Sequence, residues 1–493
     1  MVAPGPVPVH LRAHGASVGR LLLDAADVGA AWGRAGRGHV RVAGSDEDSL
    51  TLAVAAGLEA VHHGEVDPTT IGGLYWGTAR PPMAEGPTLP MLAAALGLTP
   101  GIAGLLASGS THAGIDALTA AWHAISAGAI DTALVIASDA LSPALGSSGE
   151  ASTGSGAAAW VLTGDRGNAR LLRSVTTGRP VLDRYRGDGE PATRDDYDGR
   201  LHREQWFVPD VAAIAARLRD MAGDTASGTA ASTAAATAAG RPAGDLRWAL
   251  PDPDRRLGRA AVEAAQADPD AVVSTTAVTE IGDTGAAAPF IGIIDALGVA
   301  GPAAIVAHGG GRTTGLLLEV DEAVPGTDLA TALAASAPAG YGTVLRARQR
   351  LVPDSETVPM GIPPGSAMLA RETDELLRLL GARCSECDAV STPPSVHPTC
   401  AACGSPKLTT TTLPRTGTVH TFVINHTMPA PFEAPLPIIV VDLDDGSRTQ
   451  VQGASDGSDI AIGAPVRLVL RRYATERGVP IYGYKAVVTG QEG

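Results

Sequence analysis

The sequence predicts an α/β protein built from two similar halves, followed by a small cysteine-rich region and a β-barrel. Short apolar runs alternate with amphipathic helical patterns over residues 46–320, which is typical of strands that helices cover on both faces. All four cysteines lie within residues 384–403. After them, alternating apolar and polar residues separated by Gly and Asp turns indicate antiparallel strands.

Composition limits the classes of protein that this chain can represent. Its 493 residues, 45% of them hydrophobic and 18% charged, indicate two or three globular domains. The formal net charge of −15 disfavours binding to nucleic acid or to an anionic membrane, because phosphate contacts need clustered Lys and Arg. We therefore expect neither nucleic acid nor membrane as a partner.

The start of the chain and its apolar runs suggest a location. The first residues, MVAPGPVPVH, lack the basic start and apolar core of a secretory signal. No stretch has the roughly 18 uninterrupted apolar residues that a membrane span needs. We expect a soluble, cytoplasmic protein.

The first predicted half, residues 1–165, alternates helices with buried strands. Residues 46–62 repeat apolar positions at helical spacing, and residues 89–98 predict a second helix. The other predicted elements of this half are an amphipathic helix that follows the small-residue run in the stretch 105–122 and short core strands at 71–78, 132–141 and 156–164.

The second predicted half, residues 166–322, repeats this alternation around an insertion. Residues 210–222 predict a helix, and the Ala/Thr/Gly-rich segment at about 222–244 predicts a flexible insertion. The remaining predicted elements are a strand at 245–250, helices at 256–266 and 289–298, and a hairpin of residues 303–311 and 313–320.

The C-terminal third is predicted to be modular. Residues 323–365 are rich in Pro, Gly and Ala and predict a linker. An amphipathic helix, residues 366–384, leads into the cysteine cluster, so that helix and cluster together occupy 366–408. Residues 409–493 predict the barrel.

The four cysteines have the spacing of a structural metal site. Cys384, Cys387, Cys400 and Cys403 form two CxxC pairs separated by twelve residues. Each pair turns two thiolates toward one ion, so the two pairs predict a closed tetrahedral Zn site that stabilises a small domain. Two disulfides are the alternative. His397 is expected to be a surface loop residue rather than a ligand.

The C-terminal region resembles a known two-part architecture. The helix, the cysteine cluster and the barrel, which includes HTFVINHTMPAPFEAPLPIIVVDLDDG, resemble an acyl-CoA-associated family with a rubredoxin-like zinc ribbon and an OB-fold, over about residues 340–490. The resemblance implies contact with coenzyme A and partnership with thiolase-fold enzymes. Few aromatic residues are present for stacking nucleic-acid bases, which disfavours that use of an OB-fold.

Residues from about 45 to 320 also resemble a known superfamily. The segments GSDEDSLTLAVAAGLEAV, DPTTIGGLYWGTARPP, GAIDTALVIASDAL and ASTGSGAAAWVLTGD are similar to the thiolase superfamily, especially to archaeal hydroxymethylglutaryl-CoA synthases, with ketoacyl synthase III as a cousin. The resemblance implies the duplicated αβαβα thiolase-like fold and a coenzyme A thioester as ligand or substrate. It also implies a homodimer, or a heteromer with an active thiolase or synthase.

The resemblance assigns the usual catalytic positions to unusual residues. The nucleophilic cysteine, activated at a helix N-terminus, corresponds to Thr111. The acidic residue of the family corresponds to Ala79, and its histidine to Ala249 or Leu250. Its asparagine corresponds to Asp283, which is either a base or the cap of the following helix, and we favour the cap. Acyl-enzyme chemistry of the usual kind is therefore not expected.

Three histidines are further candidates for chemistry. His112 lies at the start of the helix after Thr111, and a simple hydrogen-bonding role competes with catalysis there. His308, before three glycines, and His202, near Trp206, could line a pocket, although a lone histidine is more often a packed or surface residue.

Two functional hypotheses follow. The first is a hydroxymethylglutaryl-CoA synthase-like, acyl-CoA-binding pseudoenzyme that supports acyl transfer by a partner thiolase or synthase. The second is an active enzyme, an acyltransferase or an aldolase-type lyase, that makes or breaks carbon–carbon bonds of a CoA thioester without a covalent intermediate. It requires a positioned acid or base, for which His112, Asp283 and His308 are the candidates.

Overall fold

The structure is a computed structural model that describes residues 7–195, 198–228, 246–351, 365–428, 432 and 434–489. The chain divides into two compact units, each described by itself below. The first unit comprises Met1–Gly44, Asp48–Pro81 and Gly101–Leu351, and the second comprises Ser45–Glu47, Pro82–Pro100 and Val352–Gly493. Two short segments of the predicted N-terminal half are thus grouped with the C-terminal unit.

A nine-stranded sheet forms the framework of the first unit. Its strand order is β11-β12-β13-β8-β1-β7-β6-β4-β5. The strands are β1 (Val9–Val18), β4 (Gly73–Thr78), β5 (Ala103–Ser108), β6 (Thr132–Ala140), β7 (Ser155–Thr163), β8 (Ala169–Gly178), β11 (Arg247–Ala249), β12 (Gly301–Gly309) and β13 (Arg312–Val320). Only three residues of β1 pair with β8, so the sheet consists of two halves joined by a short antiparallel ladder.

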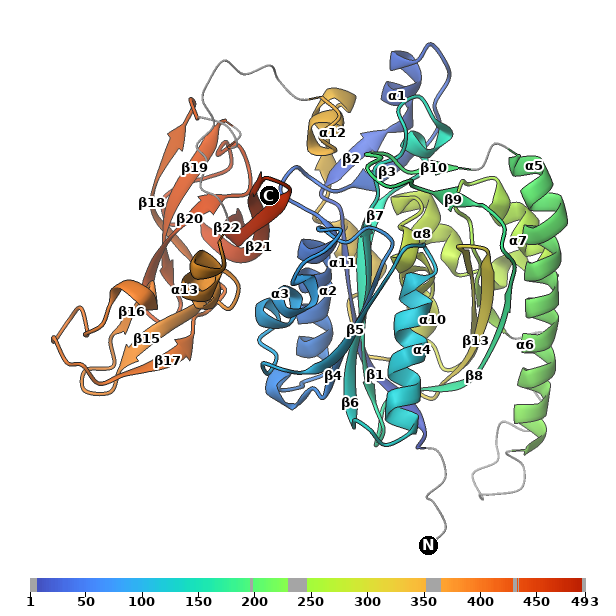
Figure 1. The fold of residues 1–493 in the computed structure, drawn as a ribbon, viewed down its shortest axis with the longest axis horizontal. Coiled ribbons are helices and arrows are strands. Elements are labelled where there is room, and N and C mark those ends of the chain that lie inside the picture. The colour runs from blue at the N-terminus through green and yellow to red at the C-terminus, as the bar shows by residue number, and fades with distance from the viewer. Residues whose placement is uncertain are drawn as a thin grey trace, which may run out of the picture. The chain divides into compact units, whose positions relative to one another are not determined.

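Helices lie on both sides of each half of the sheet (Figure 1). Helix α2 (Ser49–His63) packs on β1, β6 and β7, and α4 (Ala113–Ser126) packs on β4 and β6. Helix α9 (Ala288–Gly292) contacts both β7 and β12, and α6 (Val208–Gly228) packs on β8, β12 and β13. The layers therefore run α2, first half-sheet, α4 with α9, second half-sheet, α6, which is the predicted duplicated αβαβα arrangement.

Local sequence explains why α2 begins where it does. The Asp48 carboxylate accepts hydrogen bonds from the N–H groups of Leu50 and Thr51, both at 3.0 Å. The Thr51 hydroxyl accepts from the N–H of Asp48 at 2.9 Å, which completes a capping box. The helix thus starts at Ser49, three residues after the predicted position.

The second half differs in detail from its predicted elements. Helix α6 extends to Gly228, so the start of the predicted insertion at 222–244 is helical, and residues 229–244 lie outside the described residues. The predicted helix at 289–298 is two short helices, α9 and α10 (Ile294–Leu297), which meet at Ile293. The predicted strand and helix at 245–266 correspond to β11 and α7 (Leu257–Ala265).

The predicted linker at 323–365 is wrong over most of its described part. It contains α11 (Leu329–Leu333), β14 (Ala337–Pro338) and α12 (Tyr341–Ala347). Strand β14 pairs with β2 (Leu21–Asp24), and Val344 is fully buried with Val40 of β3 (His39–Val42). These contacts between distant segments are invisible in the local composition, and residues 352–364 lie outside the described residues.

The second unit contains helix α3 (Thr88–Ala95), which corresponds to the predicted helix at 89–98, a second helix, a small sheet and a closed barrel. Helix α13 (Ser366–Leu376) is shorter than predicted, because Leu379 adopts a positive φ of 53° and residues Leu380–Cys384 form strand β15. Strand β15 pairs with β16 (Val390–Ser391) and β17 (Leu408–Thr412). The barrel has the order β18-β19-β20-β22-β21, with strands Thr416–Asn425, Leu436–Leu443, Arg448–Gly453, Val479–Val488 and Pro465–Glu476.

Among the residues that the structure describes, no helix combines the length and apolar character that crossing a membrane requires.

Candidate functional site

The turn between β5 and α4 is the centre of the candidate site. Glycines let neighbouring backbone approach the first turn of α4: a Cβ at Gly77 would lie 2.3 Å from the carbonyl oxygen of Ala113. A Cβ at Gly114 would lie 2.3 Å from the carbonyl oxygen of Ala286. The end of β4 and the 3₁₀ turn Gly285–Ala287 therefore both pack against the start of α4.

Thr111 lies in this turn, partly buried, two residues before α4 begins. A Cβ at Gly309 would lie 2.1 Å from Thr111 Oγ1 and 3.2 Å from the backbone nitrogen of His112. The end of β12 therefore lies directly against the Thr111 hydroxyl. The residue at the predicted nucleophile position is packed beside the glycine run that follows His308.

His112 is buried, at 1% exposure, and both of its ring nitrogens have partners. Nδ1 lies 3.2 Å from Asp116 Oδ1, and Nε2 lies 2.8 Å from Thr314 Oγ1. Thr314 in turn lies 2.9 Å from the hydroxyl of Thr176. These contacts hold the imidazole in a hydrogen-bond chain that does not include the hydroxyl of Thr111.

Asp283 is also engaged by its neighbours. It is 6% exposed, forms an ion pair with Arg184, and accepts a hydrogen bond from the N–H of Gly285 at 3.0 Å. Burial disfavours the charged guanidinium, but Asp283 and Asp195 outweigh that effect and hold the pKa of Arg184 above its ordinary value. The bond to Gly285 joins residues two apart in the turn before α9; the N-cap of the 3₁₀ turn Gly285–Ala287 is Thr284, without a side-chain cap, so the choice between cap and base stays a prediction.

The carboxyl group of Asp252, which was not among the predicted site residues, lies close to the expected histidine position. Leu250 is buried and its N–H donates to Ser274 Oγ at 3.1 Å. Asp252 follows two residues after Leu250. Burial is the main cause that raises the pKa of Asp252 to about 6, and the charge of Asp283 raises this pKa further. The position of Asp252 after a buried strand and a proline is visible in the sequence, whereas the burial that raises its pKa is not.

The carboxyl group of Asp139, which was also not among the predicted site residues, connects two loops of the site by hydrogen bonds. Asp139, at the end of β6, has no exposed surface and accepts hydrogen bonds from Thr78 Oγ1 and the N–H of Ala286, both at 2.8 Å. Burial raises the pKa of Asp139 to about 7, against these bonds and those from the N–H groups of Arg80 and Ala79. Asp139 therefore ties the loop that carries Ala79 to the turn after Asp283.

His308 and His202 come together although they are 106 residues apart. Their Nε2 atoms are 3.3 Å from each other, and Nδ1 of His308 lies 2.8 Å from Thr313 Oγ1. One donor atom each from Asp183, His202 and His308 lies within 4.8 Å of the other two. Burial is the main cause that lowers the pKa of His308 to about 4, which leaves its imidazole neutral.

The four cysteines of the second unit form one cluster. Sγ of Cys384 lies 3.6 Å from that of Cys403, and Sγ of Cys387 lies 3.5 Å from that of Cys400. A disulfide requires about 2.05 Å, whereas four thiolates around one zinc ion lie about 3.8 Å apart. The predicted disulfide alternative is not present, and the donor set fits a tetrahedral metal ion with soft ligands.

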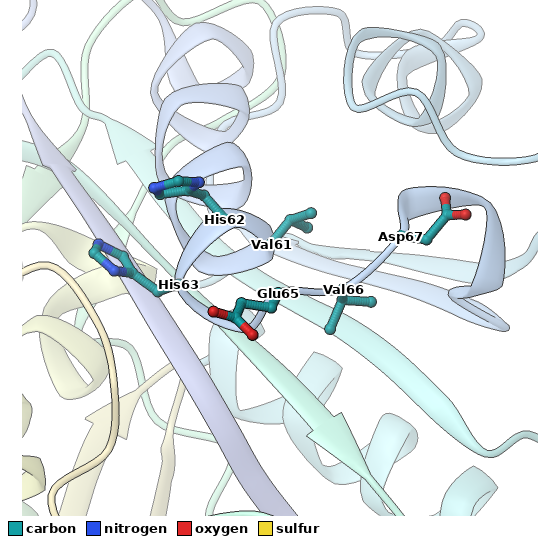
Figure 2. Close-up of a pocket in the computed structure, with 6 residues that line it drawn as sticks. All are labelled: Val61, His62, His63, Glu65, Val66 and Asp67. Carbon is teal, nitrogen blue, oxygen red and sulfur yellow. The ribbon is translucent and has the colours of Figure 1, made fainter.

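A shallow surface hollow lies at the C-terminal end of α2 (Figure 2). Side chains from the last turn of α2 and from the loop after it line the hollow. They are Val61, His62, His63, Glu65, Val66 and Asp67. None of them belongs to the clusters around Thr111, Asp283 or His308.

The fold and the place of Thr111 at the start of α4 define the first unit as thiolase-like. Its solved neighbours include MvaS in complex with 3-hydroxy-3-methylglutaryl coenzyme A, with a TM-score of 0.56 and 18% identity over 73% of this chain and 95% of that one. Another is the priming β-ketosynthase of the R1128 polyketide pathway, with a TM-score of 0.54 and 22% identity over 66% of this chain and 99% of that one.

Sequence comparisons name the particular relatives. The hydroxymethylglutaryl-CoA synthase of Methanopyrus kandleri is 32% identical over 195 residues, 37% of this chain and 54% of that protein. That of Methanosphaera stadtmanae is 29% identical over 37% of this chain and 53% of that protein, so the chain spans about half the length of these curated relatives. Residues 410–471 match the family described as the ChsH2 C-terminal OB-fold domain. The chain thus joins a part homologous to hydroxymethylglutaryl-CoA synthases to an OB-fold of the ChsH2 type.

Proposed function

We propose that this protein binds acyl-CoA and supports acyl transfer by a partner thiolase or synthase, without forming an acyl-enzyme itself. The observation that carries the proposal is Thr111 at the start of α4, where the resemblance places a cysteine nucleophile. All four cysteines of the chain lie at 384–403, in the second unit. The first unit therefore has no thiol to accept an acyl group.

The surroundings of Thr111 support this proposal. A hydroxyl attacks a thioester only when a neighbouring base removes its proton. His112, the adjacent imidazole, is held by Asp116 and Thr314, and Asp283 is paired with Arg184. The hydrogen bonds and ion pairs described for these side chains do not include the Thr111 hydroxyl.

Two relatives support coenzyme A thioesters as the ligand class. MvaS was solved with 3-hydroxy-3-methylglutaryl coenzyme A, and a hydroxymethylglutaryl-CoA synthase was solved with CoA. The latter has a TM-score of 0.55 and 16% identity, covering 72% of this chain and 95% of that one. The ligand is therefore proposed for this chain from the shared fold.

Edge strand β5 supports association with a second thiolase-fold chain. It is the last strand of the nine-stranded sheet, and Leu105 is 40% exposed on it. An edge strand presents unpaired backbone groups that another strand can pair with. We propose a homodimer, or a heteromer with an active thiolase or synthase, through this edge.

The cysteine cluster is proposed to hold a structural zinc ion. Four thiolates leave no open coordination position, so the ion stabilises the fold of the small sheet β15–β17 rather than a reaction.

Acetyl-CoA tests the covalent part of the proposal. We expect acetyl-CoA to bind in equilibrium dialysis while the intact mass of the protein stays unchanged. Thr111→Ala is expected to bind acetyl-CoA within about twofold of the unmodified chain, because the hydroxyl forms no bond to the acyl group. A mass increase of one acetyl group that disappears in Thr111→Ala would overturn the proposal.

Co-purification from the native cell tests the partner. The expected companion is a thiolase-fold chain with a cysteine nucleophile, whose acyl transfer becomes faster when this protein is added. Recovery of this chain alone, together with turnover of an acyl-CoA by the isolated chain, would contradict the supporting role.

A second function, carbon–carbon chemistry without a covalent intermediate, is favoured by Asp252. A carboxyl group with a pKa near 6 is suited to accept a proton at neutral pH. In a retro-aldol cleavage it would take the β-hydroxyl proton of a 3-hydroxyacyl-CoA as the carbon–carbon bond breaks to give a carbonyl compound and a thioester enolate. Turnover by the isolated chain that Asp252→Asn abolishes would favour this function.

A further inference from the structure

We propose that Asp183, His202 and His308 form a second metal site, one that holds a divalent ion of the zinc type in the first unit. All three residues belong to that unit, and their donor atoms converge within 4.8 Å. Two imidazoles and one carboxylate are a donor set that zinc and similar transition metals favour.

The spacing of the two histidines fits ligands of one ion. With Zn–N bonds of about 2.0–2.1 Å, two ligands at a tetrahedral centre lie about 3.3 Å apart. The Nε2 atoms of His202 and His308 are 3.3 Å apart. This distance is longer than the usual 2.9–3.0 Å of a hydrogen bond from a ring N–H, which is the alternative explanation of the pair.

A neighbouring hydroxyl orients the His308 ring. His308 on β12 is directly opposite Thr313 on β13 in the antiparallel ladder, and Thr313 Oγ1 lies 2.8 Å from Nδ1. A hydroxyl that accepts from Nδ1–H leaves the lone pair of Nε2 available for a metal. Ligating histidines commonly have such a partner on their second nitrogen.

The site is partly shielded from water. His202 is 6% exposed, and Phe207, which is fully buried, has its ring centroid 5.1 Å from that of His308 and 6.5 Å from that of His202. Two neutral imidazoles and the single carboxylate of Asp183 leave a net positive charge on a bound divalent ion. Three protein ligands also leave one tetrahedral position for water or an anionic ligand.

The proposed site neighbours the Thr111 turn. Gly309 follows His308 directly, and its close approach to the Thr111 hydroxyl places the end of β12 beside that turn. A metal ion here would act as a Lewis acid on a molecule bound to the first unit, a role that requires no thiol. This inference does not depend on acyl-CoA binding or on a partner chain.

Zinc content tests the inference in the full chain. After equilibrium dialysis against micromolar Zn²⁺ and quantification by mass spectrometry, we expect two zinc ions per chain, one in the cysteine cluster and one at this site. His308→Ala and His202→Ala are expected to hold one. The matched control, His123→Ala, removes an exposed histidine of α4 and should keep two.

Cobalt separates the two sites and excludes misfolding as the cause of metal loss. In the Co²⁺-loaded His308→Ala chain, the thiolate-to-cobalt charge-transfer bands of the cysteine cluster should persist. Thr313→Val retains all three ligands and should lower the affinity of this site for its metal ion by about tenfold. One zinc ion in the unmodified chain, or two in both histidine variants, would show that the pair is only hydrogen-bonded and overturn the inference.

Discussion

At the scale of single residues, Thr111 lies just before α4, at the position where the resemblance places a cysteine nucleophile. The start of α4 directs backbone N–H groups and the positive end of the helix dipole toward this turn, which stabilises anions. A threonine hydroxyl has a far higher pKa than a thiol and gains little from that field. The setting therefore suits binding of a polarised carbonyl more than covalent attack.

Asp283 gives a residue-scale prediction. Replacing Asp283 with Asn should lower the free energy of unfolding of the first unit by about 2–3 kcal/mol, because Arg184 then keeps only Asp195 as a charged partner. Urea unfolding followed by tryptophan fluorescence measures the change.

The matched control for Asp283→Asn is Asp321→Asn. Asp321 pairs with Arg170 in an exposed position, where ion pairs contribute little, so its removal should hardly change the unfolding midpoint. Equal effects of the two substitutions would contradict a buried, stability-determining pair at Asp283.

Some site residues could be predicted from the sequence, and others could not because their properties depend on packing between distant segments. Thr111 and Asp283 could be found because they stand in motifs that a resemblance covers. The raised pKa values of Asp139 and Asp252 depend on burial by segments remote in sequence. The pairing of His202 with His308 likewise arises only when α5 (Gly199–His202) packs near the end of β12.

At the scale of elements, the contact between β12 and the Thr111 turn can be tested by a double substitution. Gly309→Ala should lower stability by about 1–3 kcal/mol, because the added methyl group meets Thr111 Oγ1. Adding Thr111→Ala removes that oxygen and should restore part of the loss. The coupling is measured as a double-mutant cycle of unfolding free energies.

Gly342→Ala is the control for this cycle, since a Cβ at Gly342, in α12, meets nothing within 4 Å. It should leave stability unchanged or raise it slightly, and it should not couple to Thr111→Ala. Additive effects of Gly309→Ala and Thr111→Ala would show that β12 does not pack on the turn.

Elements with continuous apolar signals were predictable, whereas strand β5 and the segment from α11 to α12 were not. Helices α2 and α4 and strands β6 and β7 have continuous apolar signals that agree with the structure. Strand β5 is mostly exposed, so burial left no pattern in its sequence. The segment with α11 to α12 was assigned to a linker because its Pro and Gly content outweighed its few buried residues.

At the scale of the whole molecule, metal removal should affect the two units differently. A strong chelator should abolish the thermal transition of the small sheet β15–β17 in the second unit, because metal ligation supplies folding energy to so small a domain. Differential scanning calorimetry with and without Zn²⁺ measures this.

Cys387→Ser should reproduce the effect of the chelator, because it removes one of the four thiolates. The major transition of the first unit should stay within a few degrees in Cys387→Ser, because this substitution leaves every residue of the first unit in place. A second unit that melts at the same temperature with and without metal would contradict a structural ion in the cysteine cluster.

The edge strand β5 has a consequence for how assembly and ligand binding influence each other. Its last residue, Ser108, is followed directly by the turn that carries Thr111, so under the proposed association a chain that pairs with β5 would also order that turn. A ligand that binds more tightly to the ordered turn must then raise the affinity between the chains. By linkage, association raises the affinity for the ligand by the same factor. Under this proposal, the rate of subunit exchange would report whether a ligand is bound, even in a chain that catalyses nothing.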